Sequence, residues 1–128
     1  MIMTVCGDMI SEKYIGNYVS SLVNCFYKIL PMREDGEPSL QLYMEGLRRE
    51  LIGCGALIPI LGEEPMYITL LCILQSFIDH PDMAIADVKR DVFRAITICK
   101  NLSGKILRGE EIGDEKSKDT APGGGDET

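Results

Sequence analysis

Apolar residues recur every three or four positions along four stretches of the chain, a spacing that predicts four amphipathic helices. The four stretches are residues 9–30, 39–53, 66–78 and 83–103, and the last can continue to residue 107. Asp8 or Ser11 can cap the first helix, and Pro31 is expected to stop it. The Gly-Cys-Gly sequence at 53–55 is expected to end the second helix, because glycine accepts the left-handed conformation found there.

The third stretch, Met66–Ile78, contains no charge and organises the rest of the chain. The uncharged run from 65 to 78 is shorter than the roughly 20 residues that a membrane-spanning helix needs. On a helical projection its small or polar residues fall on one line, and large side chains occupy the other sides. The stretch is therefore expected to be either the core of the monomer or the seam between copies. The residues proposed for this core or oligomer seam are Tyr67, Leu70, Leu71, Leu74, Phe77 and Ile78.

These patterns predict an all-α fold: a compact four-helix, bundle-like domain over residues 9–108 with a central hydrophobic third helix. Residues 1–8 are expected to form a loose N-terminal lead-in. The apolar connector at 56–62 is expected to pack against the body or to meet a partner. Residues 109–128 contain one large aliphatic residue, and we predict that they form a disordered acidic tail.

Charge is distributed unevenly along the 128 residues, whose net charge is −7. The predicted tail holds seven acids and two bases, whereas the first 108 residues hold 13 acids and 11 bases. The helical body is therefore nearly neutral, which argues against general binding to duplex nucleic acid. A local basic surface is still compatible with this balance.

One such surface is predicted on the outer side of the fourth helix, within a sector of about 80° on a 3.6-residue helix. The members of this basic strip are Arg90, Arg94, Thr97, Asn101, Lys105 and Arg108. It could bind the phosphates of a nucleic acid, a nucleotide or another phosphorylated ligand, or an acidic protein. It could also be an ordinary solvated face, with Asp87 and Asp91 as local partners, or be shielded by the acidic tail.

Residues that could carry catalysis or bind metal are sparse. The five cysteines have no Cys-x-x-Cys spacing, and the start of the chain lacks the basic region of a secretory signal. We therefore expect reduced, mostly buried thiols in a cytoplasmic protein. His80 is the only histidine and is expected to lie at a helix end. No catalytic residue, metal ligand or cofactor site is predicted, and an enzyme is not expected.

In size and composition the chain resembles the small helical proteins common on prophages and other mobile elements. This resemblance rests on no motif, and no residue role follows from it. The function expected from the sequence is a cytoplasmic protein-interaction or adaptor module that forms a homo-oligomer and meets an unidentified protein partner. The apolar excess of the first and third helices favours self-association. The alternative is binding of nucleic acid or a phosphorylated ligand along the basic strip.

Overall fold

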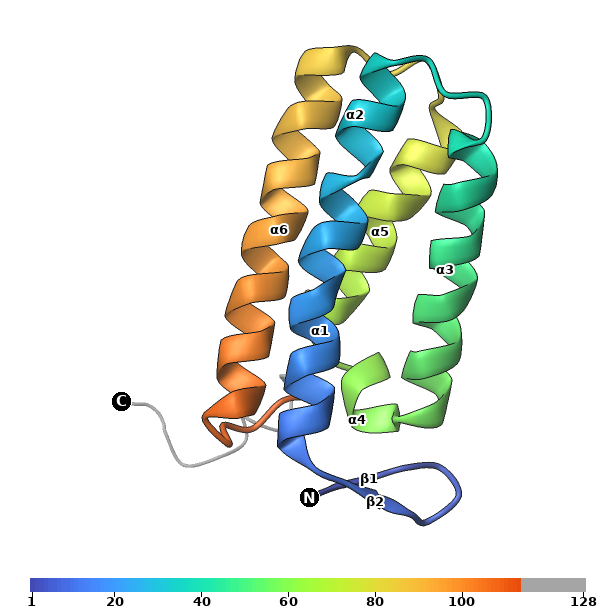
Figure 1. Cartoon of the computed structure of the whole chain (residues 1–128). Coiled ribbons are helices and arrows are strands. Elements are labelled where there is room, and N and C mark those ends of the chain that lie inside the picture. The colour runs from blue at the N-terminus through green and yellow to red at the C-terminus, as the bar shows by residue number, and fades with distance from the viewer. Residues whose placement is uncertain (114–128) are drawn as a thin grey trace.

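The computed structural model describes residues 1–113, which form four long helices, two short helices and a two-stranded hairpin (Figure 1). The helices are α1 (Glu12–Tyr27), α2 (Ile29–Glu34), α3 (Leu40–Leu57), α4 (Pro59–Gly62), α5 (Pro65–Asp79) and α6 (Ile85–Leu107). The hairpin consists of β1 (Ile2–Met3) and β2 (Met9–Ile10). The prediction of a compact all-α fold is confirmed.

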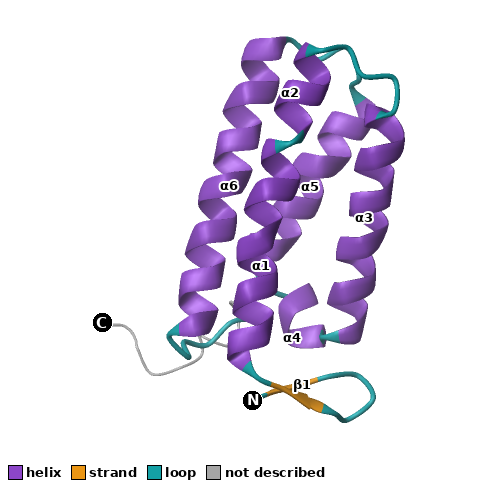
Figure 2. Cartoon of the chain, viewed as in Figure 1, coloured by secondary structure: helices purple, strands orange, loops and turns teal. Residues whose placement is uncertain are grey.

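The four long helices run alternately up and down, and α2 extends the line of α1 (Figures 1 and 2). The most extensive helix contact joins α1 to α6, and α5 packs against both α3 and α6. Three tyrosine hydroxyls connect α3 with its neighbours. Tyr43 donates to the carbonyl of Cys25 at 2.8 Å, Tyr67 to that of Leu51 at 2.6 Å, and Tyr18 to the Glu50 carboxylate at 2.8 Å.

The contact between α1 and α6 uses small residues. The hydroxyl of Ser103 donates to the carbonyl of Gly16 at 2.7 Å, and both residues are buried. A β-carbon on Gly16 would lie only 2.6 Å from Leu107. The side chain of Leu107 therefore occupies the space that a side chain at position 16 would fill, so Gly16 has a packing role.

The break after α1 corrects the expectation that Pro31 stops the first helix. The helix ends four residues before the proline, at Tyr27, and α2 begins at Ile29. A continuous helix would place the proline ring against the carbonyl of Tyr27, so the helix is interrupted at Lys28 instead. Pro31 then lies in the first turn of α2, where its missing N–H needs no partner.

The Gly-Cys-Gly sequence does not end α3, which continues through 53–55 to Leu57. Gly55 instead contacts the backbone of Gly62 in α4. A β-carbon on Gly55 would lie 3.1 Å from the Gly62 α-carbon, and one on Gly62 would lie 2.5 Å from the Gly55 carbonyl oxygen. The predicted apolar connector forms α4 and packs inward through Ile58 and Leu61, which are buried.

Helix α5 supplies a large part of the core. Tyr67, Leu70, Leu74 and Phe77 of the proposed seam are buried, and Leu71 and Ile78 are half-buried. The opposite side of α5 is open, since Ile68 is 45% exposed. Helix α5 therefore turns most of its large apolar side chains toward the core and leaves Ile68 exposed.

The first ten residues differ from the predicted loose lead-in because they form an antiparallel hairpin that pairs Ile2 with Ile10 and Met3 with Met9. In its turn, the N–H of Gly7 donates to the carbonyl of Thr4 at 3.0 Å, and Gly7 has φ +89°. The N–H of Thr4 donates to the carbonyl of Asp8 at 2.8 Å, which leaves residues 5–7 as the loop. A three-residue hairpin loop typically places glycine in this left-handed position.

The described chain continues past the predicted domain end at residue 108. Ile112 is buried in the core, and the N–H of Gly113 donates to the Glu64 carboxylate at 2.8 Å. Residues 109–113 therefore pack on the domain, although the sequence assigned them to the tail. The rest of the predicted disordered tail, from residue 114 on, lies outside the described residues.

Candidate interaction surfaces

The basic strip predicted on α6 is only partly available to a partner. Arg90, Arg94, Thr97 and Asn101 are exposed. The guanidinium of Arg90 already contacts two carboxylates of its own helix, that of Asp87 at 3.2 Å and that of Asp91 at 3.1 Å. Those carboxylates raise the pKa of Arg90 above its ordinary value, so it stays fully charged, but its charge is largely compensated. The six predicted residues therefore do not act as one uniform cationic surface.

Lys105 has to be removed from this exposed strip. Its side chain is only 16% exposed, and its ammonium nitrogen lies 4.0 Å from the Glu64 carboxylate, which is itself buried. The Glu64 carboxylate also accepts a hydrogen bond from the N–H of Met66 at 3.2 Å, which caps α5. Glu64 therefore joins the start of α5, the end of α6 and Gly113, and Lys105 belongs to that buried polar group.

Arg108 is exposed, but its guanidinium contacts the carboxylate of Glu110 at 2.6 Å. That contact raises the pKa of Arg108 above its ordinary value. The hydroxyl of Thr97 donates to the carbonyl of Phe93 at 3.1 Å, within α6. The ends of the predicted strip are thus compensated by local partners, and its centre lies near Arg94.

The structure adds three residues to that centre. Phe93 is 44% exposed on the outer side of α6, and Lys89 and Lys100 are exposed on the same helix. Residues 85–108 carry six bases and two acids, in a chain whose net charge is −7. The exposed cations Lys89, Arg94 and Lys100 therefore lie on the same helix as an exposed aromatic ring. The sequence reasoning missed Phe93 because it scored only polar residues on this side.

A second surface, also missed, lies on the hairpin. Side chains of successive strand residues point to opposite sides. Ile2 and Ile10 are half-buried and pack against the core, whereas their neighbours Met3 and Met9 are 59% and 49% exposed. An antiparallel hairpin with one solvated side normally carries polar residues there. This hairpin is apolar on both sides.

The apolar surface continues from the hairpin onto the end of the helical bundle. The N–H of Val5 donates to the carbonyl of Leu57 at 2.7 Å, so the hairpin turn lies against the end of α3. Val5 is 65% exposed, Leu57 is 43% exposed and Ile60 of α4 is 39% exposed. We call Met3, Val5, Met9, Leu57 and Ile60 the hairpin patch. The sequence signal that could have indicated it is the pair of apolar segments that flank Gly7-Asp8.

The cysteines differ from the expectation of mostly buried thiols. All five are free, but only Cys99 is buried, and Cys6 and Cys72 are exposed. Burial raises the pKa of the Cys99 thiol to about 12, which keeps it protonated. Burial also raises the pKa of Cys25, although that thiol is half-exposed.

His80 follows the last residue of α5 and is exposed, with its Nδ1 atom 3.0 Å from the carbonyl oxygen of Ser76. Within residues 1–113, no three histidine, cysteine, aspartate or glutamate side chains come close enough to hold a metal ion. None of the helices in that part of the chain is long and apolar enough to cross a membrane.

No protein-family model, curated protein or solved structure matches this chain. The resemblance to proteins of prophages and other mobile elements therefore stays a prediction.

Proposed function

We propose that this protein is a small helical interaction module that self-associates through the hairpin patch. The observation that carries the proposal is the outward-facing pair Met3 and Met9. Ile2 and Ile10 cover one side of the hairpin against the core, whereas Met3 and Met9 leave its other side apolar and exposed. Exposed apolar patches usually mark association sites.

A second copy of the chain is the partner that fits this surface best. The hairpin patch contains no charged side chain, so two copies can meet about a two-fold axis without like-charge repulsion within the patch. The patch is short, because each strand has only two residues. Self-association through it is therefore weak and concentration-dependent, as is typical of small interfaces.

The test is light scattering coupled to size-exclusion chromatography over a range of concentrations up to high micromolar. We expect the mass to rise from monomer towards dimer in the natural protein. Met3→Thr combined with Met9→Thr should keep the chain monomeric, since threonine suits a strand but removes the apolar contact. The matched control is Leu42→Gln, which removes a 69% exposed side chain on α3 at the other end of the bundle.

Chemical crosslinking gives an independent measurement at the same surface. Cys6 is exposed in the hairpin turn, whereas Cys72 is exposed on α5. A short bis-maleimide reagent should join two copies through Cys6. Cys6→Ser should abolish the crosslinked dimer, and Cys72→Ser should leave it. A strictly monomeric particle at high micromolar concentration contradicts the proposal, as does a dimer that survives the double methionine substitution.

A second candidate function is binding of single-stranded nucleic acid along α6. The observation that favours it is the exposed Phe93 ring among Lys89, Arg94 and Lys100, because aromatic stacking together with cations is the usual mode of such binding. The net negative charge of the whole chain opposes it.

Fluorescence anisotropy with a labelled oligothymidine, measured at two salt concentrations, tests this second function. We expect salt-sensitive binding that Phe93→Ala weakens and that Arg94→Gln with Lys100→Gln abolishes. Arg49→Gln is the control, since Arg49 is an exposed cation on α3. If Arg49→Gln has the same effect as the α6 substitutions, or if no binding occurs at low salt, nucleic acid is not the ligand.

A further inference from the structure

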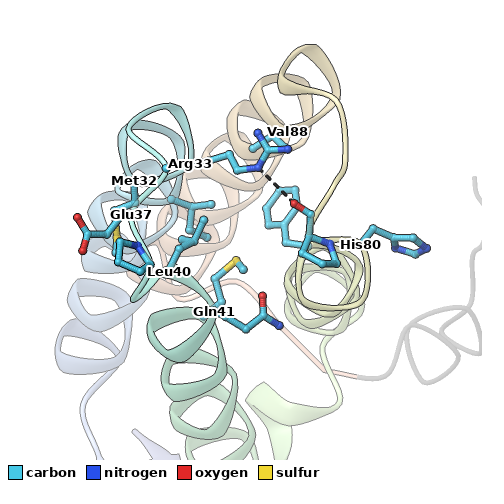
Figure 3. Close-up of a pocket in the computed structure, with 13 residues that line it drawn as sticks. Met32, Arg33, Glu37, Leu40, Gln41, His80 and Val88 are labelled. Atoms are coloured by element: carbon cyan, nitrogen blue, oxygen red, sulfur yellow. Dashed lines mark hydrogen bonds between the residues drawn. The ribbon is translucent and has the colours of Figure 1, made fainter.

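A pocket opens at the end of the bundle opposite the hairpin, where α2, α3, α5 and the start of α6 converge (Figures 1 and 3). Its volume is about 370 Å³. Buried apolar side chains form its inner wall, and polar side chains lie at its mouth. The apolar lining includes Ile29, Leu40, Met44, Phe77 and Val88. This volume and lining are typical of a site for a small, mainly apolar ligand.

Arg33 is the residue at the mouth that determines the ligand's charge. Its Nε and Nη2 atoms donate to the carbonyls of Pro81 and Met83, which fixes the guanidinium beside the pocket. A guanidinium has five N–H donors, so Arg33 has further donors that bond to neither of these carbonyls. Because the side chain is only half-exposed, an acceptor in the pocket would satisfy donors that are partly shielded from water.

The other polar groups at the mouth do not compensate Arg33. The carboxylate of Glu37 accepts a hydrogen bond from Ser39 at 3.1 Å and points away from the guanidinium (Figure 3). The His80 ring also points out of the pocket (Figure 3). Gln41 uses its amide N–H to bond the carbonyl of Ile78 at 3.0 Å. The charge that faces the pocket is therefore positive.

From this arrangement we infer that the pocket binds a small monocarboxylate with an unbranched or compact apolar tail. The tail lies against the inner wall between Met44, Phe77 and Val88. The carboxylate lies at the mouth and accepts hydrogen bonds from Arg33, since charge-assisted bonds from a guanidinium to a carboxylate are stronger than neutral ones. The site is at the other end of the molecule from the hairpin patch, and binding there does not depend on self-association.

The experiment uses sodium octanoate below its aggregation concentration, with 1-octanol and acetate as matched probes. Calorimetric titration or NMR shift mapping on the full chain measures binding. We expect octanoate to bind more tightly than 1-octanol by roughly tenfold, the ratio that one charge-assisted hydrogen bond supplies. Acetate, which has the charge without the tail, should not bind measurably.

Two pairs of variants locate the site. Leu40→Trp fills the mouth of the pocket from α3 and should abolish octanoate binding, whereas Leu42→Trp, on the exposed side of the same helix, should leave it unchanged. Arg33→Met should reduce octanoate affinity roughly tenfold and leave 1-octanol affinity within about twofold. Arg33→Lys should retain part of the preference for octanoate over 1-octanol.

Three outcomes overturn the inference. If the pocket resonances do not shift at the highest octanoate concentration below aggregation, there is no such site. Equal affinity for octanoate and 1-octanol excludes recognition of the carboxylate. Equal loss of binding in Leu40→Trp and Leu42→Trp places octanoate outside the pocket. The double methionine variant of the hairpin should bind octanoate normally. Octanoate binding and self-association can therefore be tested independently.

Discussion

Substitution of Gly62 by alanine should show how closely α4 approaches α3. The added β-carbon would lie 2.5 Å from the carbonyl oxygen of Gly55 and 2.9 Å from its carbonyl carbon. A carbon and a carbonyl oxygen normally approach no closer than about 3.3 Å, so the two backbones would have to separate by roughly 0.8 Å. Forced repacking of this kind typically costs about 1–3 kcal/mol, of which the lower flexibility of the unfolded alanine chain offsets about 0.4–1 kcal/mol.

The matched control is Gly53→Ala, nine positions earlier in α3. A β-carbon there meets no atom within 4 Å, so alanine should stabilise the helix by about 0.5–1 kcal/mol. The same chemical change should therefore have opposite signs at the two positions. Urea unfolding followed by circular dichroism measures both free energies, with an expected difference of roughly 2 kcal/mol. If Gly62→Ala is as stable as Gly53→Ala, the close backbone contact is not present in the folded protein.

Three further predictions concern buried polar groups and thiols. Glu64→Ala should lower the free energy of unfolding by about 2 kcal/mol, because buried donors lose their acceptor; a loss below about 0.5 kcal/mol in denaturant titration contradicts this. A thiol reagent should label Cys6 and Cys72 in the folded protein and Cys99 only in denaturant, and rapid labelling at Cys99 would refute its burial. Burial raises the pKa of Tyr43 to about 12, and its hydroxyl donates to a backbone carbonyl of α1. The pKa of an ordinary tyrosine is about 10. The stability that the protonated Tyr43 hydroxyl contributes is therefore full below about pH 10 and is lost as the pH rises to about 12. Alkaline unfolding of Tyr43→Phe should therefore depend less on pH than that of the natural chain.

Hydrophobic spacing was enough to predict four long helices, because each buries one apolar side against the same core. It could not predict what individual glycines and prolines do. Gly55 was assigned to a helix end, whereas it allows the contact with Gly62, seven residues further along the chain. Both roles require a residue without a side chain, and only the segment that packs against the glycine distinguishes them. Pro31 is similar, since a proline can follow one helix or occupy the first turn of the next.

The candidate surfaces were harder to predict than the helices. Lys105 falls on the same side of α6 as Arg94 by sequence spacing, but its long side chain reaches the carboxylate of Glu64, 41 residues earlier in the chain. No periodic pattern within α6 contains that partner. The hairpin was missed for a different reason. Each strand has only two residues, which are too few to distinguish a strand pattern from a helical one.

The pairing of α1 with α6 determines when the domain can fold during synthesis. The hydrogen bond from Ser103 to Gly16 joins residues 87 positions apart, and α6 is the most extensive neighbour of α1. At translation rates of about 5–20 residues per second, α6 follows α1 out of the ribosome by roughly 4–16 s. Throughout that interval the apolar side of α1 lacks its main partner, and the growing chain is open to chaperones and to aggregation. Helix α1 is thus made well before the helix that covers most of its apolar side.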